Sequence, residues 1–309
     1  MNRLVFHIAS GDAFFAGVAL LVVAVLLQTS NAPRRQRAAN WFLSGGLIAI
    51  GFSATALPAW AYALLLVALA LGRFARSFGR RSALATAAGV SALVAVGLLE
   101  APSHVMPALR PSAARRVAII GDSITAGYGA DDATTKWPAI LRDRHRVDVQ
   151  DLSRMGATAA SAATRLRENP VDAPVVLVEI GGNDMLGKTT PAAFETALDA
   201  LLEALRRPGR QIVMFELPLP PLHERFGRIQ RKLAARHGVA LIPKRVLLSV
   251  IEGTDATVDS LHLTQQGHDR MAALVWAILA PAMPAPAGQP TDLSARFVSS
   301  SRSASGRSL

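Results

Sequence analysis

Three long stretches without a charged residue, all in the first third of the chain, restrict the fold more than any other feature. They cover residues 13–33, 38–72 and 82–99. A helix that spans a bilayer needs about 20 mostly apolar residues, so the first stretch suffices for one span and the last is slightly short. The middle stretch is too long for one helix. It predicts two spans that turn near Pro58, because proline ends a helix.

Two arginine clusters, at residues 34–37 and 73–81, distinguish between three and four spans. With four spans both clusters fall on one side of the membrane, and an excess of Lys and Arg marks the cytoplasmic side. With three spans they would fall on opposite sides. The clusters favour four spans in residues 1–100, with the amino terminus and everything after Glu100 on the side opposite the cytoplasm. A signal peptide is the alternative for the first stretch, and buried helices of a soluble domain are the alternative for all three.

The charge of the chain does not indicate a nucleic-acid-binding protein. The formal net charge is +11, but residues 1–109 alone hold eight basic and two acidic residues. Much of the excess therefore lies between the apolar stretches, whereas a nucleic-acid-binding protein would concentrate it on the folded domain. The chain has no cysteine, which removes disulfides, thiolate catalysis and cysteine metal sites.

Residues 115–281 alternate short apolar runs with helical patterns. The runs lie at residues 117–122, 147–152, 175–180, 211–217 and 239–243. The helical patterns include residues 191–206, 222–237 and 264–280. This alternation predicts a three-layer α/β/α sandwich around a five-stranded parallel sheet with strands buried on both faces. Residues 101–114 are interpreted as a linker and residues 282–309 as a disordered tail.

Polar motifs follow the first three runs. The first run ends in Gly121-Asp122-Ser123, which makes Ser123 a candidate nucleophile at the carboxyl edge of the sheet, where ligands bind in open α/β folds. After the second run, Gly156 lets a backbone N–H approach a reacting centre. After the third, Asn183 in Gly-Gly-Asn-Asp can donate hydrogen bonds to an oxyanion without adding charge.

A fourth motif, Asp259-Ser260-Leu261-His262, lies just before the last helical pattern. The spacing of three residues allows the carboxylate to orient the imidazole. Each motif is weak by itself, because Gly-Gly-Asn-Asp also forms turns and a lone histidine is more often structural than catalytic.

In this chain order the four motifs resemble the blocks of the SGNH (GDSL) hydrolase superfamily, over residues 115–280. The pair Trp137-Pro138 and the pattern Glu-x-Gly-Gly-Asn-Asp are similar to its bacterial thioesterase/lysophospholipase/arylesterase group. The chain differs from that group in Asp151, where asparagine is common, and in the apolar N-terminal region.

The resemblance implies a flavodoxin-like SGNH hydrolase domain and a serine esterase mechanism. Ser123 would be the nucleophile, His262 the general base, and Asp259 the acid that orients it. The oxyanion hole would consist of the backbone N–H groups of Ser123 and Gly156 and the side-chain amide of Asn183. No cofactor and no metal are expected.

The expected function is therefore that of an esterase anchored in the bacterial inner membrane, with its catalytic domain on the periplasmic side. It would act on envelope glycan O-acyl groups, lysophospholipids or small esters. The alternative is an acyltransferase that moves an acyl group onto a cell-envelope sugar through the same site. A non-catalytic envelope-binding module is a third possibility, against which the complete motif set argues. The expected partners are the ester substrate and the lipid around the N-terminal helices, and the oligomeric state stays open.

Overall fold

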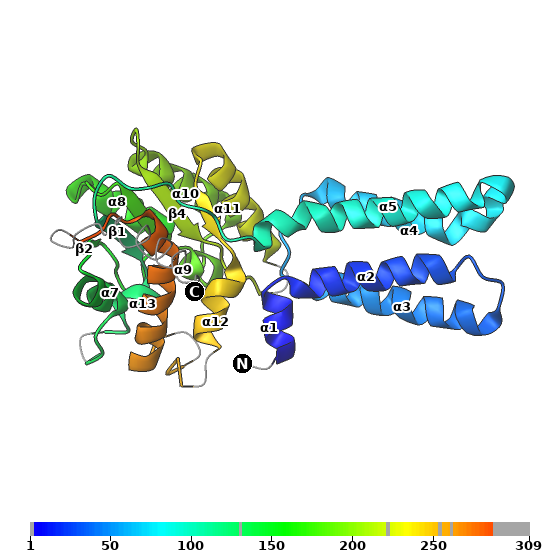
Figure 1. Cartoon of the computed structure of the whole chain (residues 1–309), viewed down its shortest axis with the longest axis horizontal. Coiled ribbons are helices and arrows are strands. Elements are labelled where there is room, and N and C mark those ends of the chain that lie inside the picture. The colour runs from blue at the N-terminus through cyan, green and yellow to red at the C-terminus, as the bar shows by residue number, and fades with distance from the viewer. Residues whose placement is uncertain (1–2, 130–131, 221–222, 253–254, 260–261, 287–309) are drawn as a thin grey trace, which may run out of the picture.

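The computed structural model describes residues 3–129, 132–220, 223–252, 255–259 and 262–286. A helical stalk, residues 12–100, projects from a sheet domain, residues 115–283 (Figure 1). The prediction that residues 282–309 form a disordered tail is wrong at its start, because Ala282 and Met283 are buried and Met283 belongs to the core of the sheet domain. From position 287 onward the predicted tail lies outside the described residues.

The sheet domain is built on one five-stranded parallel sheet with the strand order β2-β1-β3-β4-β5. The strands are β1 (Arg116–Gly121), β2 (Asp148–Asp151), β3 (Val175–Glu179), β4 (Gln211–Phe215) and β5 (Ala240–Ile242). In the register of the sheet, Ile119 of β1 lies opposite Asp151 on one side and Leu177 on the other. The prediction of five parallel strands is confirmed.

Helices cover both faces of the sheet. One layer contains α8 (Ala159–Glu168), α10 (Pro191–Leu205) and α11 (Glu224–His237), and the other contains α7 (Trp137–His145), α12 (Lys244–Ile251) and α13 (Gln265–Leu279). Ala118 and Ile120 enter the first core while Val117 and Ile119 enter the second, because successive side chains of a strand point to opposite faces. Short helices α6 (Ser123–Ala126), α9 (Gly182–Leu186) and η3 (Ala280–Ala282) complete the domain.

Strand β2 differs from the prediction that every strand is buried on both faces. Asp148 and Asp151 at its ends are exposed, and the two residues between them are half-buried. β2 lies at the edge of the sheet with β1 as its only neighbour, so solvent reaches it from the open side.

The stalk consists of α2 (Asp12–Leu27), α3 (Pro33–Phe52), α4 (Ala59–Phe74) and α5 (Ser82–Glu100). The short helices α1 (Arg3–Ala9), η1 (Ala75–Arg81) and η2 (Ala101–His104) flank them. Two hairpins, α2–α3 and α4–α5, pack on each other mainly through α2 and α5. Glycines let the helices approach closely: a Cβ added at Gly46 would lie 3.0 Å from the carbonyl oxygen of Gly17.

Four helices thus occupy the four stretches in which spans are predicted. Among the described residues, one helix, Gly79–His104, is by itself long and apolar enough to cross a membrane. Helices α1 and α2 meet the criterion only together, across a bend of 86°. Helix α4 is apolar but shorter, and α3 carries three arginines among its first five residues. The four-span arrangement therefore stays a prediction.

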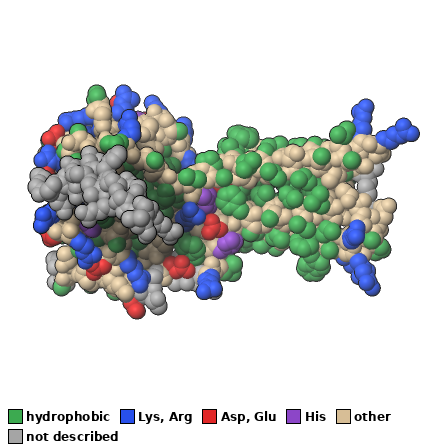
Figure 2. All heavy atoms as spheres, in the orientation of Figure 1, with side chains coloured by type: hydrophobic (Ala, Val, Ile, Leu, Met, Phe, Trp, Pro, Cys, Tyr) green, Lys and Arg blue, Asp and Glu red, His purple; other side chains and the backbone are tan. Residues whose placement is uncertain are grey.

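Both arginine clusters lie at the end of the stalk that is remote from the sheet domain (Figure 2). The other end holds the start of α2 and the end of α3, where the hydroxyl of Ser53 donates to the carbonyl of Gly11 at 3.3 Å. The N-terminal helix α1 lies at this end too, beside α12 of the sheet domain.

Buried charges join the stalk to the sheet domain, in the region where acidic, basic and histidine side chains meet in Figure 2. Arg231 of α11 donates to the two carboxylate oxygens of Glu100 at 2.7 and 2.8 Å and to Glu216 at 2.7 Å. The Lys244 ammonium donates to the carbonyl of Ala54 and lies 3.8 Å from Glu216. Since Ala54 also belongs to the core under α8, α10 and α11, the two parts share a packed interface.

Candidate active site

Ser123 is the first residue of α6, directly after β1, and its side chain is half-buried at the carboxyl edge of the sheet. Asp122 caps this helix, since its Oδ1 accepts a hydrogen bond from the N–H of Ile124 at 3.0 Å. The strand ends at Gly121, where an added Cβ would collide with the side chain of Thr125. Glycine at this position therefore permits the tight turn from strand to helix that exposes Ser123.

His262 lies between Ser123 and Asp259. Its Nε2 is 3.1 Å from the Oγ of Ser123, and its Nδ1 is 2.6 Å from Oδ2 of Asp259. The backbone N–H of His262 also donates to Asp259 Oδ1 at 2.9 Å, so one carboxylate contacts both ring and backbone. A carboxylate at Nδ1 favours the tautomer in which Nδ1 carries the proton, which leaves Nε2 to accept from the serine hydroxyl. The fold thus joins the three predicted residues, Ser123, His262 and Asp259, by hydrogen bonds.

Gly156 lies in the loop after β2 with a φ of +71°, a conformation that favours glycine. This loop is attached to the turn before Ser123, since the N–H of Arg154 donates to the carbonyl of Gly121 at 3.0 Å. In the part of the chain that the structure describes, the backbone N–H groups of Gly156 and Ser123 have no acceptor. Both are therefore available to an incoming oxygen.

Asn183 connects the loops around Ser123. Its Nδ2 lies 3.2 Å from Oδ2 of Asp122 and 3.1 Å from the carbonyl oxygen of Ala157, in the loop that contains Gly156. An amide nitrogen carries two N–H donors, and both have an acceptor here. To donate to an oxyanion, Asn183 must share or exchange one of these two long hydrogen bonds.

The neighbouring Asp184 is buried and accepts a hydrogen bond from the N–H of Ala159 at 2.9 Å. It therefore holds the start of α8 against the Asn183 loop. Among the described residues, no group of three or more His, Asp or Glu side chains could hold a metal ion.

Glu179, to which sequence reasoning assigned no role, lies directly behind the nucleophile turn. Its carboxyl group is buried and accepts from the hydroxyl of Thr125 at 3.0 Å and from the N–H of Asp122 at 3.3 Å. Burial raises the pKa of Glu179 well above its ordinary value, and the charge of Asp122 raises it further. Burial also raises the pKa of Asp122 to about 6. The sequence does contain a signal that could have identified Glu179: it is an acidic residue at the end of an otherwise apolar strand.

These raised pKa values predict how the Glu179→Gln variant changes the pH dependence of stability. A carboxyl group with a raised pKa in the folded state contributes stability that is present at low pH and lost as pH rises through that pKa. The free energy of unfolding of the wild type, relative to Glu179→Gln, should therefore fall as pH rises above the ordinary glutamate pKa of 4.5. Denaturant unfolding of both proteins between about pH 4.5 and 7.5 measures the difference. A difference that rises with pH would contradict a protonated Glu179.

Residues 119–270 match the GDSL-like Lipase/Acylhydrolase family. The sequence is 29% identical to Esterase TesA of Pseudomonas aeruginosa over 187 residues, which are 55% of this chain and 90% of the relative. It is 32% identical to Thioesterase 1/protease 1/lysophospholipase L1 of Escherichia coli K12 over 151 residues, 45% of this chain and 71% of the relative.

An Arylesterase of Vibrio mimicus is 29% identical over 143 residues, which cover 42% of this chain and 71% of the relative. Among solved structures, the crystal structure of TesA has 28% sequence identity and a TM-score of 0.47, over 54% of this chain and 99% of that one. All of these matches are confined to about half of the chain. The sequence matches and the arrangement around Ser123 agree, and the chain belongs to the GDSL-like lipase/acylhydrolase family as a hydrolase of ester bonds.

Proposed function

We propose that this protein is a membrane-anchored serine esterase that hydrolyses carboxylic esters through an acyl-enzyme on Ser123. The observation that carries the proposal is the continuous hydrogen-bonded line from Ser123 Oγ to His262 Nε2 and from His262 Nδ1 to Asp259, with distances of 3.1 and 2.6 Å. A serine hydroxyl is a weak nucleophile by itself, and an adjacent base oriented by a third group activates it.

In the first half of the reaction, His262 accepts the hydroxyl proton as Ser123 attacks the ester carbonyl. Asp259 orients the imidazole and stabilises the imidazolium that forms. His262 then donates this proton to the departing alcohol, leaving an acyl group on Ser123. In the second half, water replaces the alcohol: His262 takes a proton from the water, hydroxide attacks the acyl carbonyl, and His262 returns the proton to Ser123 as the acid leaves.

The oxyanion of each tetrahedral intermediate would accept hydrogen bonds from the N–H groups of Ser123 and Gly156 and from Asn183. Loss of one such donor typically lowers kcat by about 10²–10³-fold, and we expect this loss for Asn183→Ala. Kinetics with p-nitrophenyl butyrate measure it. Asn169→Ala, which removes an exposed asparagine at the end of α8, is the matched control and should retain kcat. An unchanged kcat in Asn183→Ala would remove Asn183 from the oxyanion hole.

The test of the esterase proposal uses the full chain in detergent. It should release p-nitrophenol and free acid from p-nitrophenyl esters, and a series from acetate to palmitate would define the preferred acyl length. Release of free acid without an added acceptor indicates hydrolysis, whereas dependence on an added sugar would indicate the acyltransferase alternative. No release from any ester by the folded protein would contradict the proposal. The names of the relatives, which include thioesterase and lysophospholipase, extend the test to these substrate classes.

The membrane anchor in the proposal, residues 1–100, is supported by how little of the stalk is buried. In the candidate span Gly79–His104, 22% of the most apolar window is buried, whereas a core helix of a soluble protein is mostly buried. Large apolar side chains, among them Trp41, Leu66 and Leu84, are exposed on the stalk. Apolar side chains accordingly cover its sides in Figure 2. Such a surface suits contact with lipid, since soluble proteins rarely expose apolar patches of this extent.

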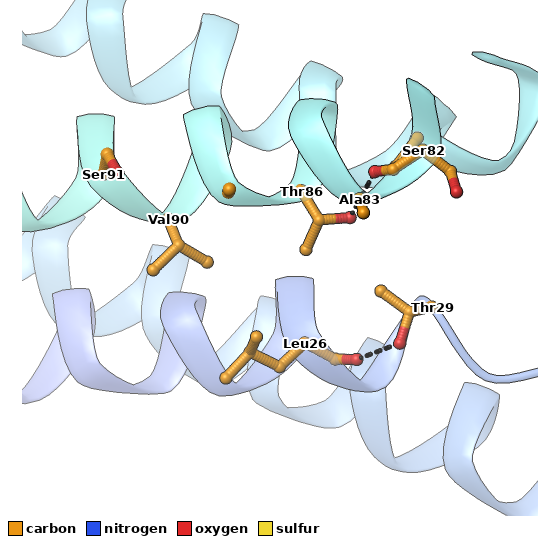
Figure 3. A pocket seen from close by; sticks show the side chains of 9 residues that line it. Leu26, Thr29, Ser82, Ala83, Thr86, Val90 and Ser91 are labelled. Atoms are coloured by element: carbon orange, nitrogen blue, oxygen red, sulfur yellow. Dashed lines mark hydrogen bonds between the residues drawn. The ribbon is translucent and has the colours of Figure 1, made fainter. Parts of the chain in front are cut away.

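Two hydroxyl groups beside the cavity between α2 and α5 support the same proposal. Thr29 donates to the carbonyl of Leu26 at 2.8 Å, and Thr86 donates to the carbonyl of Ser82 at 3.0 Å (Figure 3). Both threonines line a cavity of about 540 Å³ between α2 and α5. Because each hydroxyl is satisfied by its own chain segment, it presents no unpaired donor to an apolar surrounding.

The position of the arginine clusters supports a periplasmic catalytic domain. Both clusters lie at one end of the stalk, and α1 and the sheet domain lie at the other (Figure 2). If the arginine end is cytoplasmic, the catalytic domain is on the opposite side. Alkaline phosphatase fused after Leu309 should then be active in cells, and the same fusion after Asn31, between α2 and α3, should be inactive. The reverse pattern would contradict this orientation.

A further inference from the structure

We propose that the cavity between α2 and α5 binds one anionic phospholipid, with an acyl chain in the cavity and the headgroup phosphate at the arginines of η1. This inference rests on the membrane anchor in the proposed function. It goes beyond general contact with lipid, because it assigns a defined site and a charge to the lipid that occupies it.

The length and the opening of the cavity match one leaflet of a bilayer. Its lining on α5 extends from Ser82 to Ser91, which is about 14 Å at a rise of 1.5 Å per residue. The hydrocarbon core of a bilayer is about 30 Å thick, so one leaflet occupies about half of that depth. Leu26, Ala83 and Ala87 line the cavity and are exposed. The cavity is therefore open to the surroundings of the stalk, and an acyl chain can enter it from the side.

The walls of the cavity suit a hydrocarbon chain. The lining contains no charged residue, and the small side chains of three alanines leave the space of about 540 Å³. The hydroxyls of Thr29 and Thr86 already donate to carbonyls of their own segments, at 2.8 and 3.0 Å (Figure 3). An acyl chain therefore leaves neither threonine with an unpaired donor, whereas a polar ligand would find both hydroxyl protons already engaged.

The segment η1 borders one end of the cavity. Ala75, the first residue of η1, and Ser82, the residue after it, both line the cavity. Arg80 and Arg81 thus lie within two positions of a lining residue, and both side chains are exposed. The headgroup of a lipid whose chain lies in the cavity is therefore next to these two guanidinium groups.

The positive charge at this end of the stalk has no counterpart in the stalk itself. Residues 13–99 hold seven arginines and no acidic residue. Asp12 and Glu100, which flank this range, lie at the other end of the stalk, beside the sheet domain (Figure 1). A lipid phosphate can therefore accept charge-assisted hydrogen bonds without competition from a carboxylate of the stalk. An apolar helix in the cavity would leave the arginines unpaired, so the charge favours an anionic lipid as the occupant.

The test of the headgroup uses two lipids with the same acyl chains, 1-palmitoyl-2-oleoyl-phosphatidylglycerol and the corresponding phosphatidylcholine. Native mass spectrometry of the full chain in detergent measures the Kd of the first bound lipid. The Kd should be about tenfold lower for phosphatidylglycerol, the size expected for a hydrogen bond between charged groups. The Arg80→Gln/Arg81→Gln variant should bring the ratio of the two Kd values close to one. The control Arg34→Gln/Arg35→Gln removes the same charge from α3, which contributes no residue to the lining, and should retain the preference.

The test of the acyl chain compares two neighbouring alanines of α5. Ala87 lines the cavity, whereas Ala88 is exposed on the same helix and is not part of the lining. Ala87→Leu should raise the Kd of both lipids by about tenfold or more, because the larger side chain fills the space, while Ala88→Leu should bind both as the wild type does. If the thermal midpoint of Ala87→Leu is lowered, the arginine variants, which change exposed side chains only, still decide the proposal.

A Kd ratio near one in the wild type, or equal losses of the preference in the two arginine variants, would overturn the lipid site while leaving the membrane anchor intact. A dimer that Ala87→Leu dissociates would identify a second copy of the chain as the occupant and would overturn it as well. The anchor is tested separately by sedimentation of cell membranes. Wild-type chain that stays in the supernatant would contradict the anchor, and the lipid site with it.

Discussion

The Ser123→Ala variant is expected to lose esterase turnover by about 10⁴-fold or more, because removal of the nucleophile of a serine-histidine-acid triad leaves only binding and oxyanion stabilisation. It should also lose covalent labelling by a fluorophosphonate, which reacts with activated serines. Both effects follow from the 3.1 Å contact between Ser123 Oγ and His262 Nε2. The measurements are kcat with p-nitrophenyl butyrate and mass-spectrometric mapping of the label.

The control for this variant is Ser249→Ala. Ser249 is an exposed serine of α12 whose hydroxyl donates to the carbonyl of Val246 at 2.7 Å, so it is held by its own helix. Turnover and labelling should be the same in this variant as in the wild type. Labelling that persists in Ser123→Ala would show that another residue is the nucleophile.

The Arg231→Met variant is expected to lose about 3–5 kcal/mol of folding stability, the usual cost of removing one partner from a buried ion pair. The substitution leaves Glu100 and Glu216, whose side chains are 0% and 1% exposed, without the guanidinium that pairs with both. Since Glu100 ends α5 of the stalk and Glu216 follows β4, the loss should also loosen the contact between the stalk and the sheet domain. The thermal midpoint of the full chain in detergent, together with limited proteolysis of residues 101–114, measures both effects.

Arg236→Met provides the matched control, because Arg236 lies on the same helix and is 63% exposed in its pair with Asp199. Ion pairs on the protein surface contribute little to folding stability, so the thermal midpoint of Arg236→Met should change far less than that of Arg231→Met. Equal midpoints for the two variants would contradict the structural role of Arg231. Replacing Glu100 by glutamine in the Arg231→Met background should recover part of the loss, because the remaining buried carboxylate, Glu216, still lies 3.8 Å from the Lys244 ammonium.

The buried junction also has a practical consequence for activity measurements. Residues 115–281 would be the natural fragment to express on the basis of sequence, yet Ala54 and Ala56 from the α3–α4 turn belong to the core of the sheet domain. Cutting the chain after the stalk would expose that core and leave Arg231 and Lys244 without partners from the stalk. Measurements of activity therefore require the full chain.

Much of the catalytic arrangement was predictable because it follows from local rules. An apolar run that ends in Gly-Asp-Ser predicts a strand followed by an exposed serine, and parallel strands place their carboxyl ends at one edge. The motifs after β1, β2 and β3 are therefore neighbours in any fold of this type. The three-residue spacing of Asp259 and His262 likewise predicts their contact from local geometry alone.

Other parts of the site could not be predicted, because they depend on which distant side chains share a buried space. Glu179 is a carboxyl group in an apolar strand, and only the packing of α6 against β3 shows that it contacts Thr125 and Asp122. The two hydrogen bonds that the Asn183 amide donates, to Asp122 and to the carbonyl of Ala157, likewise could not be predicted from the sequence.

The amino-acid sequence by itself determined the five-stranded parallel sheet, the position of the candidate nucleophile and the four long helices of the N-terminal region. These features depend on periodicity and on residues close together in the chain, where the backbone geometry leaves few alternatives. The tertiary structure decided how the stalk is joined to the sheet domain and which buried charges are paired: Arg231 contacts Glu100 across 131 positions of the chain. Sequence spacing carries no information about such a contact, because desolvation and pairing energies depend on the final positions of both groups.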